Sequence, residues 1–324
     1  SQRPGLTQPD LSGLQMKRPL LGTVLALLSS LLFGLNASTA KVIMQNDVTP
    51  EQLVLFRCLA TAIVAGLIVL ITDRRSFSVA KSEWKTLLAF GVIGVALMQW
   101  AYSNAVNTLP IGIALLVEYT AIVMVPIASY LLFHEKATRQ LWAGAGLVIA
   151  GLLVVSNIWE GGLNPIGLFF GFGAAVFLSI YFIMGERGQR NRSAISLLFY
   201  SMSIASAFWF LASPWWQFDA GKLGELINLD GSLAHINVPG WALLLWLGVM
   251  GGFAPMLLSY AALRHLSASS VGVASTAETV FAFLFAWIWL GQTVSQLQLL
   301  GGVLVIIGIV LAQTSRRKSW QLSN

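Results

Sequence analysis

Residues 144–151 read GAGLVIAG and residues 301–308 read GGVLVIIG, so both stretches follow the pattern GxxLVIxG. The same shift along the chain lays residues 109–154 over residues 266–311 without a gap. Apolar helices resemble one another by composition alone, but a shared pattern at corresponding positions indicates an internal duplication. Each copy is a glycine-lined, otherwise apolar segment, which is suited to close packing between helices.

The composition indicates an integral membrane protein. Of the 324 residues, 56% are hydrophobic and 10% are charged, and the mean hydropathy is +0.76. A chain with so few polar residues cannot cover the surface of a soluble globule. Apolar stretches long enough for a hydrocarbon core of about 30 Å predict an all-α membrane protein with ten transmembrane helices. The predicted helices lie near residues 19–44, 51–72, 84–106, 110–133, 137–155, 164–185, 193–213, 240–263, 267–290 and 294–314.

The duplication divides the ten predicted helices into two sets of five. Because five is an odd number, the second set enters the membrane upside down relative to the first, which is a common organisation of secondary transporters. We therefore expect two inverted five-helix repeats, at residues 19–155 and 164–314. Residues 1–18 are predicted to form a cytoplasmic N-terminal segment, and residues 315–324 a cytoplasmic tail.

The positive charges predict the orientation. Most of the 19 Lys and Arg residues lie before the first helix, in the gaps after helices 2, 4, 6 and 8, or in the tail, whereas Lys222 lies in a gap on the opposite side. The positive-inside rule then makes both termini cytoplasmic in a multi-pass protein of the bacterial inner membrane. The same rule accounts for the sequence pI of about 9.7 without a nucleic-acid partner. The long loop at 214–240, which is rich in tryptophan, is expected at the outer interface.

Four ionisable residues stand out at membrane depth in the predicted helices: Lys41, Arg57, Glu118 and Glu278. A charge at membrane depth costs about 2.5–3.5 kcal/mol on insertion scales, so such groups normally face a cavity or a partner. One interpretation is that they hold the amino and carboxylate groups of a zwitterion or relay a proton. The alternative is structural. The residues would then form ion pairs, or their long side chains would extend to the nearer interface. This alternative is favoured for Arg57, because the residue lies close to the start of its helix.

Polar residues spaced i, i+3 and i+4 form a stripe on two predicted helices. Such stripes either line a water-filled cavity or join helices by hydrogen bonds. They consist of Gln99, Tyr102 and Ser103 on the third helix and of Ser275, Glu278 and Thr279 on the ninth.

Aromatic residues supply the apolar walls of a candidate pocket, although each one alone is better explained by contact with lipid or by a place in an interface belt. A cavity with few charged groups and many aromatic walls suits amino acids with apolar or aromatic side chains. The predicted substrate-binding residues are Phe33, Lys41, Gln99, Trp100, Tyr102, Ser103, Glu118, Tyr119, Phe177, Tyr181, Tyr260, Ser275 and Glu278.

Several chemistries are excluded by absent motifs. The sequence has no G-x-x-x-x-G-K-[ST] loop, no HExxH pair and no Cys/His cluster, and its single cysteine is Cys58. The histidines His134, His235 and His265 lie in predicted loops or at helix ends, away from the depth at which an intramembrane hydrolase needs its base. We therefore expect no enzyme activity, no cofactor and no metal site.

The segment LLFHE at residues 131–135, before a glycine-rich helix, adds a family resemblance. With ten helices in two repeats of five, the chain resembles the drug/metabolite transporter superfamily, specifically its EamA-type ten-helix exporters, over about residues 19–315. The closing glutamate of that family falls at Glu135, but its repeat counterpart is Gln292. The two proline positions of the family hold Ile122 and Thr279, and Pro126 lies one turn after the first of them.

The resemblance is strongest to aromatic amino acid exporters of that family. It implies a small-molecule substrate, namely an amino acid, with the lipid bilayer as surroundings and a proton as the candidate coupling ion.

We therefore expect a secondary transporter that exports aromatic and other neutral amino acids by alternating access. The substrate is expected between the repeats, enclosed mainly by helices 1, 3, 4, 6, 8 and 9. Bends are expected near Gly34, Pro126, Gly251, Gly252 and Pro255, because helices bend at glycine and proline. Two alternatives remain open: an exporter of other small metabolites or cationic drugs, and a passive channel.

Overall fold

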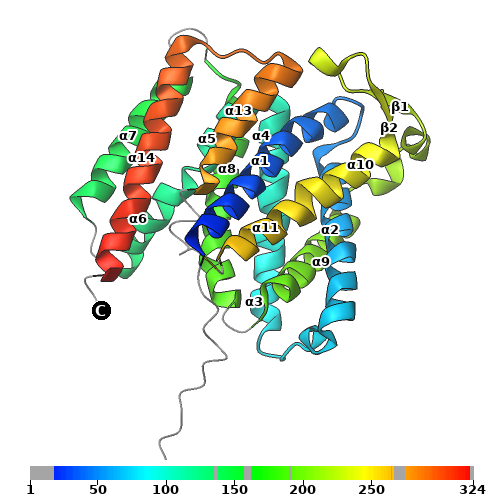
Figure 1. The fold of residues 1–324 in the computed structure, drawn as a ribbon, viewed down its shortest axis with the longest axis horizontal. Helices are drawn as coiled ribbons and strands as arrows, with labels where there is room; N and C mark the ends of the chain where they lie inside the picture. The colour runs from blue at the N-terminus through cyan, green and yellow to red at the C-terminus, as the bar shows by residue number, and fades with distance from the viewer. Residues whose placement is uncertain are drawn as a thin grey trace, which may run out of the picture.

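The computed structural model describes residues 18–134, 138–156, 162–189, 192–263, 265 and 274–321, and these residues are mostly helical (Figure 1). Two short strands, β1 (Leu226–Asn228) and β2 (Asn237–Pro239), pair antiparallel in the loop before α10. The α-helices are α1 (Pro19–Met44), α2 (Pro50–Thr72), α3 (Trp84–Ala89), α4 (Met98–Thr108), α5 (Ile111–Glu118), α6 (Ala121–Phe133), α7 (Arg139–Ser156), α8 (Pro165–Gln189), α9 (Ala194–Ala212), α10 (Gly240–Gly248), α11 (Ala254–Leu263), α13 (Ala277–Leu290) and α14 (Gln296–Gln321).

These helices form ten apolar spans in the described part of the chain, of which five are long enough to cross a membrane and five are shorter. Single helices form the first, second, fifth, sixth, seventh and tenth spans: α1, α2, α7, α8, α9 and α14. The third span joins α3 to α4 through the π-helical segment η3 (Phe90–Leu97), and the eighth joins α10 to α11 through η8 (Val249–Phe253). The fourth span is α5 and α6, and the ninth contains α13. The all-α membrane fold expected from the sequence is confirmed.

Local sequence signals explain where several spans begin. Proline occupies the first turn of α1 and of α2, where its missing N–H group costs no helical hydrogen bond. Thr49 and Gln52 form a capping box at the start of α2, in which each side chain accepts a hydrogen bond from the backbone N–H group of the other residue. The Ser193 hydroxyl accepts the same kind of bond at the start of α9.

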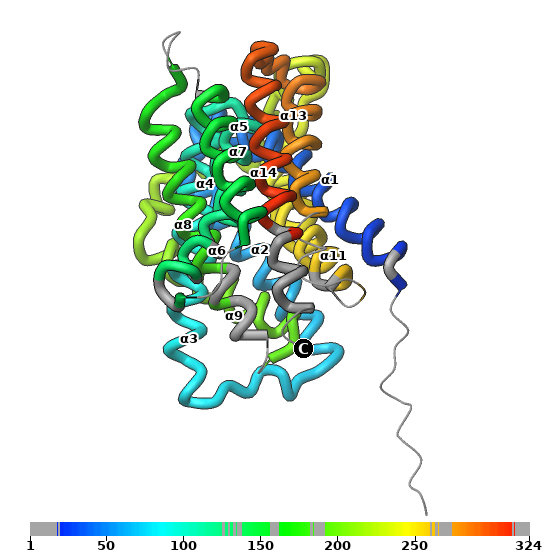
Figure 2. Tube along the Cα trace, turned by 90° about the vertical axis from the view of Figure 1, so that its left-hand side faces the viewer, coloured from blue at the N-terminus to red at the C-terminus, as the bar shows by residue number. Residues whose placement is uncertain are grey.

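The two GxxLVIxG segments face each other across α7 and α14, which lie side by side at one edge of the bundle (Figures 1 and 2). A Cβ added at Gly144 would lie 2.6 Å from the carbonyl oxygen of Gly308, and one at Gly151 would lie 2.6 Å from that of Gly301. The glycines therefore allow the backbones to touch, as expected for a glycine-lined helix. Because the first glycine of one segment meets the last glycine of the other, the two helices run antiparallel, as inverted repeats require.

Elsewhere, helices of one repeat pack on helices of the other repeat. The first span, α1, packs on α11 and α13 of the second repeat, whereas α8 of the second repeat packs on α4 and α5 of the first. The second and seventh spans, α2 and α9, pack on each other. Glycines again mark close approaches, because a Cβ at Gly34 would overlap the start of α13, and one at Gly167 would overlap Leu109.

Helix interruptions occur at corresponding places in the two repeats. The fourth span breaks at Tyr119 and Thr120, between α5 and α6, and the ninth turns at Thr276 before α13. When the sequences of the two repeats are aligned so that Gly144 corresponds to Gly301, Tyr119 corresponds to Thr276. In the same alignment, the residues of η8 correspond to residues within η3. Both repeats thus carry a π-helical segment in their third span and a break in their fourth.

The expected bends are met only in part. Gly251 and Gly252 lie in the π-helical segment η8, and Pro255 is in the first turn of α11. In contrast, α1 continues through Gly34, and α6 continues through Pro126, so the fourth span is interrupted before Pro126. The backbone of Tyr119 and Thr120 instead forms i, i+3 hydrogen bonds at the break.

An ion pair lies at each end of the bundle. We call the end that carries β1 and β2 the hairpin end, and the end where α14 finishes and α3 begins the terminal end (Figures 1 and 2). At the terminal end Arg192 pairs with Glu83 at 2.8 Å, and at the hairpin end Lys222 pairs with Asp47 at 2.8 Å. The first pair joins the loop after the second span to the turn before the seventh span. The second pair joins the loop after the seventh span to the turn before the second span.

Candidate functional site

The breaks in the fourth and ninth spans touch each other. The hydroxyl group of Tyr119, at the break between α5 and α6, donates a hydrogen bond to the carboxylate of Glu278 in the first turn of α13. Tyr119 is buried and packs within the largest apolar cluster of the described residues. This hydrogen bond joins the two repeats at the points where their helices are interrupted.

The two glutamates lie at opposite ends of their helices. Glu118 is the last residue of α5, whereas Glu278 lies in the first turn of α13. The N-terminus of a helix is the positive end of its dipole and the C-terminus is the negative end. Consequently α13 stabilises a negative charge at Glu278, and α5 opposes one at Glu118. The two carboxyl groups also interact electrostatically with each other.

Arg57 of α2 belongs to the same cluster. It interacts electrostatically with Glu118, Glu278 and the hydroxyl group of Tyr102. Arg57 is only 8% exposed, and its Nε has no hydrogen-bond partner in the part of the chain that the structure describes. Burial of this side chain disagrees with extension to an interface, which is one of the two structural alternatives for Arg57. Neither of the two ion pairs of the described residues includes Arg57.

The polar stripe of the third span divides between two roles. Tyr102 interacts electrostatically with Glu278, Glu118 and Arg57. The buried hydroxyl group of Ser103 has no hydrogen-bond partner among the described residues. Gln99 instead lies between α2 and α9, where it accepts a hydrogen bond from the Cys58 thiol at 3.6 Å and donates one to the sulfur of Met202 at 3.9 Å. Of the two interpretations of the stripe, Gln99 follows the one in which polar residues join helices.

Trp100 and Lys41 make structural contacts away from the two carboxylates. The Trp100 indole N–H group donates a hydrogen bond to Glu51 at 2.8 Å, and its ring packs against Phe170. The Nζ of Lys41 donates a hydrogen bond to the carbonyl oxygen of Leu109 at 3.1 Å, so it ties α1 to the turn between α4 and α5.

The other predicted site residues are spread over several spans. Phe33 and Phe177 are half-buried, and Tyr181 stacks on Phe90 with ring centroids 5.2 Å apart. Ser275 lies at the turn before α13. The side chain of Tyr260 is outside the described part of the structure.

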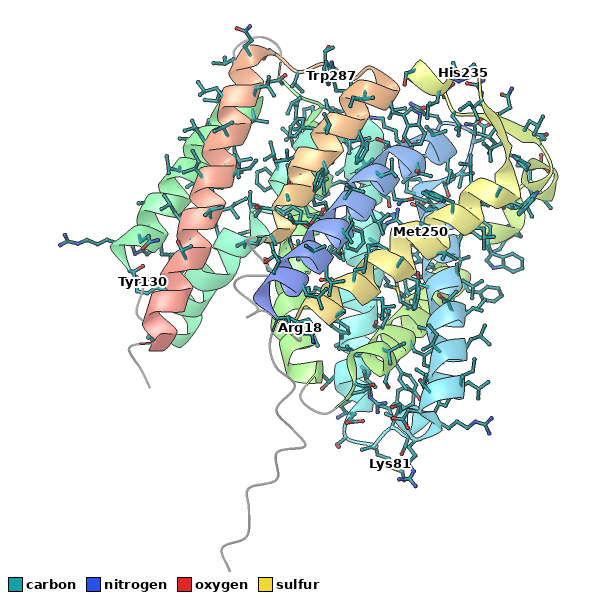
Figure 3. All side chains as sticks on the ribbon, viewed as in Figure 1. Arg18, Lys81, Tyr130, His235, Met250 and Trp287 are labelled. Carbon is teal, nitrogen blue, oxygen red and sulfur yellow. The ribbon has the colours of Figure 1, made fainter. Side chains whose placement is uncertain are left out.

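Asn36 of α1 is a candidate that the sequence analysis missed. Its Nδ2 donates hydrogen bonds to the carbonyl oxygens of Leu32 and Met250, at 2.8 and 3.0 Å (Met250 is labelled in Figure 3). Both donors are then used, whereas the buried Oδ1 has no hydrogen-bond partner among the residues that the structure describes. The available signal was an asparagine within an apolar helix, a position where a polar side chain requires a partner.

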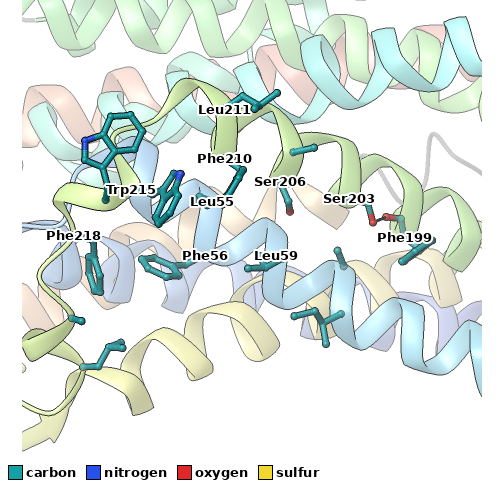
Figure 4. Close-up of a pocket in the computed structure, with 16 residues that line it drawn as sticks. Leu55, Phe56, Leu59, Phe199, Ser203, Ser206, Phe210, Leu211, Trp215 and Phe218 are labelled. Atoms are coloured by element: carbon teal, nitrogen blue, oxygen red, sulfur yellow. Dashed lines mark hydrogen bonds between the residues drawn. The ribbon is translucent and has the colours of Figure 1, made fainter.

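A separate apolar groove of about 860 Å³ lies between α2, α9 and the loop that follows α9 (Figure 4). Its walls include Phe56, Phe210 and Trp215, and Trp215 stacks on Phe210 with ring centroids 4.9 Å apart. Phe210 and the neighbouring Leu211 are exposed on the outer surface of the bundle. Walls of this kind suit lipid hydrocarbon, so we do not place a polar substrate here.

Comparisons with known proteins agree on the class. The sequence model of the EamA-like transporter family matches residues 20–157 and again residues 165–314. The chain is 25% identical to YdfC, an uncharacterised transporter of Bacillus subtilis, over 86% of this chain and 88% of YdfC. It is 24% identical to an uncharacterised transporter of Helicobacter pylori, over 90% of this chain and 95% of that protein.

A third relative has a more specific name. The threonine/homoserine exporter RhtA of Escherichia coli is 23% identical over 80% of this chain and 82% of RhtA. A crystal structure of another protein superposes with a TM-score of 0.62, at 19% identity, over 91% of this chain and 98% of that chain, which supports the fold. Because the family model covers both repeats, the chain belongs to the EamA-like transporter family and is a transporter rather than an enzyme.

Proposed function

We propose that the protein exports amino acids, aromatic and other neutral ones, across the bacterial inner membrane by alternating access. The observation that carries this proposal is the hydrogen bond from Tyr119 to Glu278, which joins the broken fourth and ninth spans. Discontinuous helices at the interface between inverted repeats form the substrate sites of many secondary transporters. A charged cluster at such a crossing is the natural place for a polar substrate.

The exchanged packing of the repeats supplies a mechanism for alternating access. Because α1 packs on α11 and α13, and α8 packs on α4 and α5, each group contains a broken or π-helical span. A tilt of one group against the other opens one end of the bundle and closes the other end. The breaks at Tyr119 and Thr276 let the helix halves move separately during that tilt.

The charges of the cluster favour a zwitterionic substrate. Arg57 supplies a positive charge, and Glu118 and Glu278 supply carboxyl groups, so both ends of an amino acid have a partner of opposite charge. The RhtA relative, named as a threonine/homoserine exporter, supports the same substrate class. A cationic drug gains from the two glutamates but is repelled by Arg57.

The arrangement of basic residues supports the orientation. The loop at the terminal end carries Arg74, Arg75 and Lys81, and Lys85 follows in the first turn of α3, whereas Lys222 lies at the hairpin end. By the positive-inside rule the terminal end, where α1 begins and α14 finishes, faces the cytoplasm, and the hairpin end faces the periplasm.

Counterflow in proteoliposomes tests the proposal. Vesicles preloaded with unlabelled amino acid would be diluted into labelled phenylalanine, threonine or glutamate. We expect saturable accumulation of label for phenylalanine and threonine that exceeds the accumulation of glutamate. Label that equilibrates without overshoot, and without saturation, would identify a channel. If folded and inserted protein shows no counterflow with any amino acid, the proposed substrate class is wrong.

A further inference from the structure

We infer that Arg57 is the subsite that binds the carboxylate of the transported molecule, and that a free carboxylate is obligatory for a substrate. The inference rests on the proposed function for its choice of amino acids. Its own basis is the state of the Arg57 side chain, which is more than nine-tenths buried while its Nε–H group lacks a hydrogen-bond partner among the described residues. A buried arginine that serves only the fold normally uses its donors.

The nearby carboxyl groups balance the charge of Arg57 without using its donors. Glu118 and Glu278 interact with the guanidinium electrostatically, but no ion pair joins Arg57 to any described residue. The carboxylate of Glu278 instead accepts the hydrogen bond from Tyr119. The planar guanidinium fork therefore remains available, and its geometry matches a carboxylate in a bidentate contact.

Two glycines bring further polar groups close to Arg57. A Cβ added at Gly252 of η8 would lie 3.4 Å from Cγ of Arg57, and one at the adjacent Gly251 would lie 2.9 Å from Cβ of Asn36. Asn36 and Arg57 therefore approach neighbouring positions of η8 from two different helices, α1 and α2. The unpartnered Oδ1 of Asn36 can only accept a hydrogen bond, so it suits an ammonium group next to the carboxylate.

These contacts define the substrate by its head group. A site with a buried, unpaired donor discriminates strongly against an analogue that cannot use the donor. Phenylalanine satisfies Arg57 and Asn36 together, whereas phenethylamine leaves Arg57 unpaired and adds a second positive charge beside it. Phenylalaninamide retains the shape of the amino acid but lacks the negative charge. We therefore expect both analogues to be rejected.

Competition in the counterflow assay is the test. In wild-type vesicles unlabelled phenylalanine should inhibit uptake of the label, and phenethylamine and phenylalaninamide should inhibit it at least about 100-fold less well. Arg57→Lys keeps the charge but loses the fork, so its half-saturating concentration for phenylalanine should rise about tenfold or more. Arg74→Gln, at an exposed position two residues beyond the end of α2, is the matched control and should behave like the wild type.

Two results would overturn the inference that Arg57 binds the substrate carboxylate. If folded Arg57→Lys and Arg57→Gln variants bind phenylalanine with unchanged half-saturation and still reject phenethylamine, the carboxylate is bound elsewhere. Equal inhibition of the wild type by phenylalanine and phenethylamine overturns the inference without any variant.

Failure of the proposed function is distinguishable from failure of this inference. If the wild type moves no amino acid, thermal unfolding of the wild type and of Arg57→Lys would be followed with benzoate and with 3-phenylpropionate. Stabilisation of the wild type that Arg57→Lys loses supports the carboxylate subsite for another class of substrate. Absence of stabilisation in both proteins overturns it.

Discussion

Tyr119 donates a hydrogen bond to Glu278, and each of these residues lies at the interruption of its own membrane span. The contact links the two repeats at corresponding places. Any movement that separates the fourth span from the ninth must break this bond, so its strength affects the balance between the open and closed ends of the transporter.

Removal of the Tyr119 hydroxyl should slow transport. Tyr119→Phe leaves the partly buried carboxylate of Glu278 without its donor, which costs about 1–3 kcal/mol in the state that contains the bond. We expect the maximal counterflow rate to fall roughly tenfold. Tyr200→Phe is the matched control, because Tyr200 also donates through its hydroxyl group, to the Phe77 carbonyl at the terminal end, and this variant should transport normally. Equal rates for the two variants would contradict a role of the contact in the cycle.

Glu278 should couple transport to protons. Glu278→Gln still accepts a hydrogen bond from Tyr119 but cannot gain or lose a proton at this position. We expect counterflow to survive and uptake driven by an imposed pH gradient to be lost. Glu118→Gln provides the comparison within the same cluster. If gradient-driven flux is unchanged in both variants, neither glutamate is the coupling site.

The glycine contact between α7 and α14 should be sensitive to a single methyl group. Gly144→Ala forces a Cβ to within 2.6 Å of a backbone oxygen, and overpacking of this kind costs about 1–3 kcal/mol. Gly146→Ala lies two residues further along the same helix, where a Cβ meets open space within 4 Å. This control should be neutral or stabilised by up to about 1 kcal/mol, since alanine favours helices. Thermal unfolding of both variants in detergent checks the difference, and equal midpoints would exclude tight backbone contact.

The pair Glu83–Arg192 predicts acid-sensitive stability at the terminal end. The hydrogen bond from Arg192 is the largest cause that holds the pKa of Glu83 below its usual value of 4.5, and it outweighs the opposing effect of desolvation. Since the folded-state pKa is the lower one, the stabilisation is complete above the unfolded value and disappears as the pH falls through the folded value. Glu83→Gln should therefore lower the unfolding midpoint at neutral pH but not at about pH 3. A difference that persists in acid would assign the effect to something other than the charge.

Arg192 explains why this ion pair should matter more than the one at the hairpin end. Its side chain is 6% exposed, also donates hydrogen bonds to the carbonyl oxygens of Ser76 and Ser78, and lies over the ring of Tyr200. Asp47, in contrast, is 87% exposed, and exposed pairs contribute little. Asp47→Asn should consequently shift the unfolding midpoint less than Glu83→Gln does.

Cysteine labelling should establish the orientation. The native Cys58 is fully buried, so an impermeant maleimide should leave the wild type unlabelled. Glu225→Cys, in the loop of the hairpin end, should be labelled from the periplasm. Lys81→Cys, at the terminal end, should be labelled only after the cells are opened. The reverse pattern would overturn the proposed sidedness.

The sequence predicted the spans because hydropathy is a local property, but it did not predict where they break. Tyr119 and Thr120 are neither glycine nor proline, and the break depends on contacts with the ninth span, far away in the chain. Pro126 carried the expectation of a bend, yet α6 runs through it. The duplication could have indicated the break, since Tyr119 and Thr276 correspond, but nothing in either residue type marks it.

The charged cluster could be predicted only as a set of candidates. Ionisable residues inside apolar helices are visible in the sequence, and Glu118 and Glu278 indeed interact with each other. Which face of a helix meets which neighbour is not visible. For this reason the sequence did not show that Lys41 and Arg57 have different surroundings. Lys41 donates a hydrogen bond to the Leu109 carbonyl, whereas Arg57 is buried and interacts electrostatically with the two glutamates. Asn36 was not predicted because it is uncharged and belongs to neither polar stripe.

The contact between α7 and α14 is self-complementary, because Gly144 and Gly151 meet Gly308 and Gly301, their own repeat partners in reverse order. Between separate subunits, such a contact would be an isologous dimer interface, in which both partners use the same patch. A half-length chain with one GxxLVIxG helix would already carry the patch needed to bind a second copy inserted the other way up. Joining two such copies in one chain fixes their opposite orientations and frees each half to diverge, as Tyr119 and its counterpart Thr276 have done.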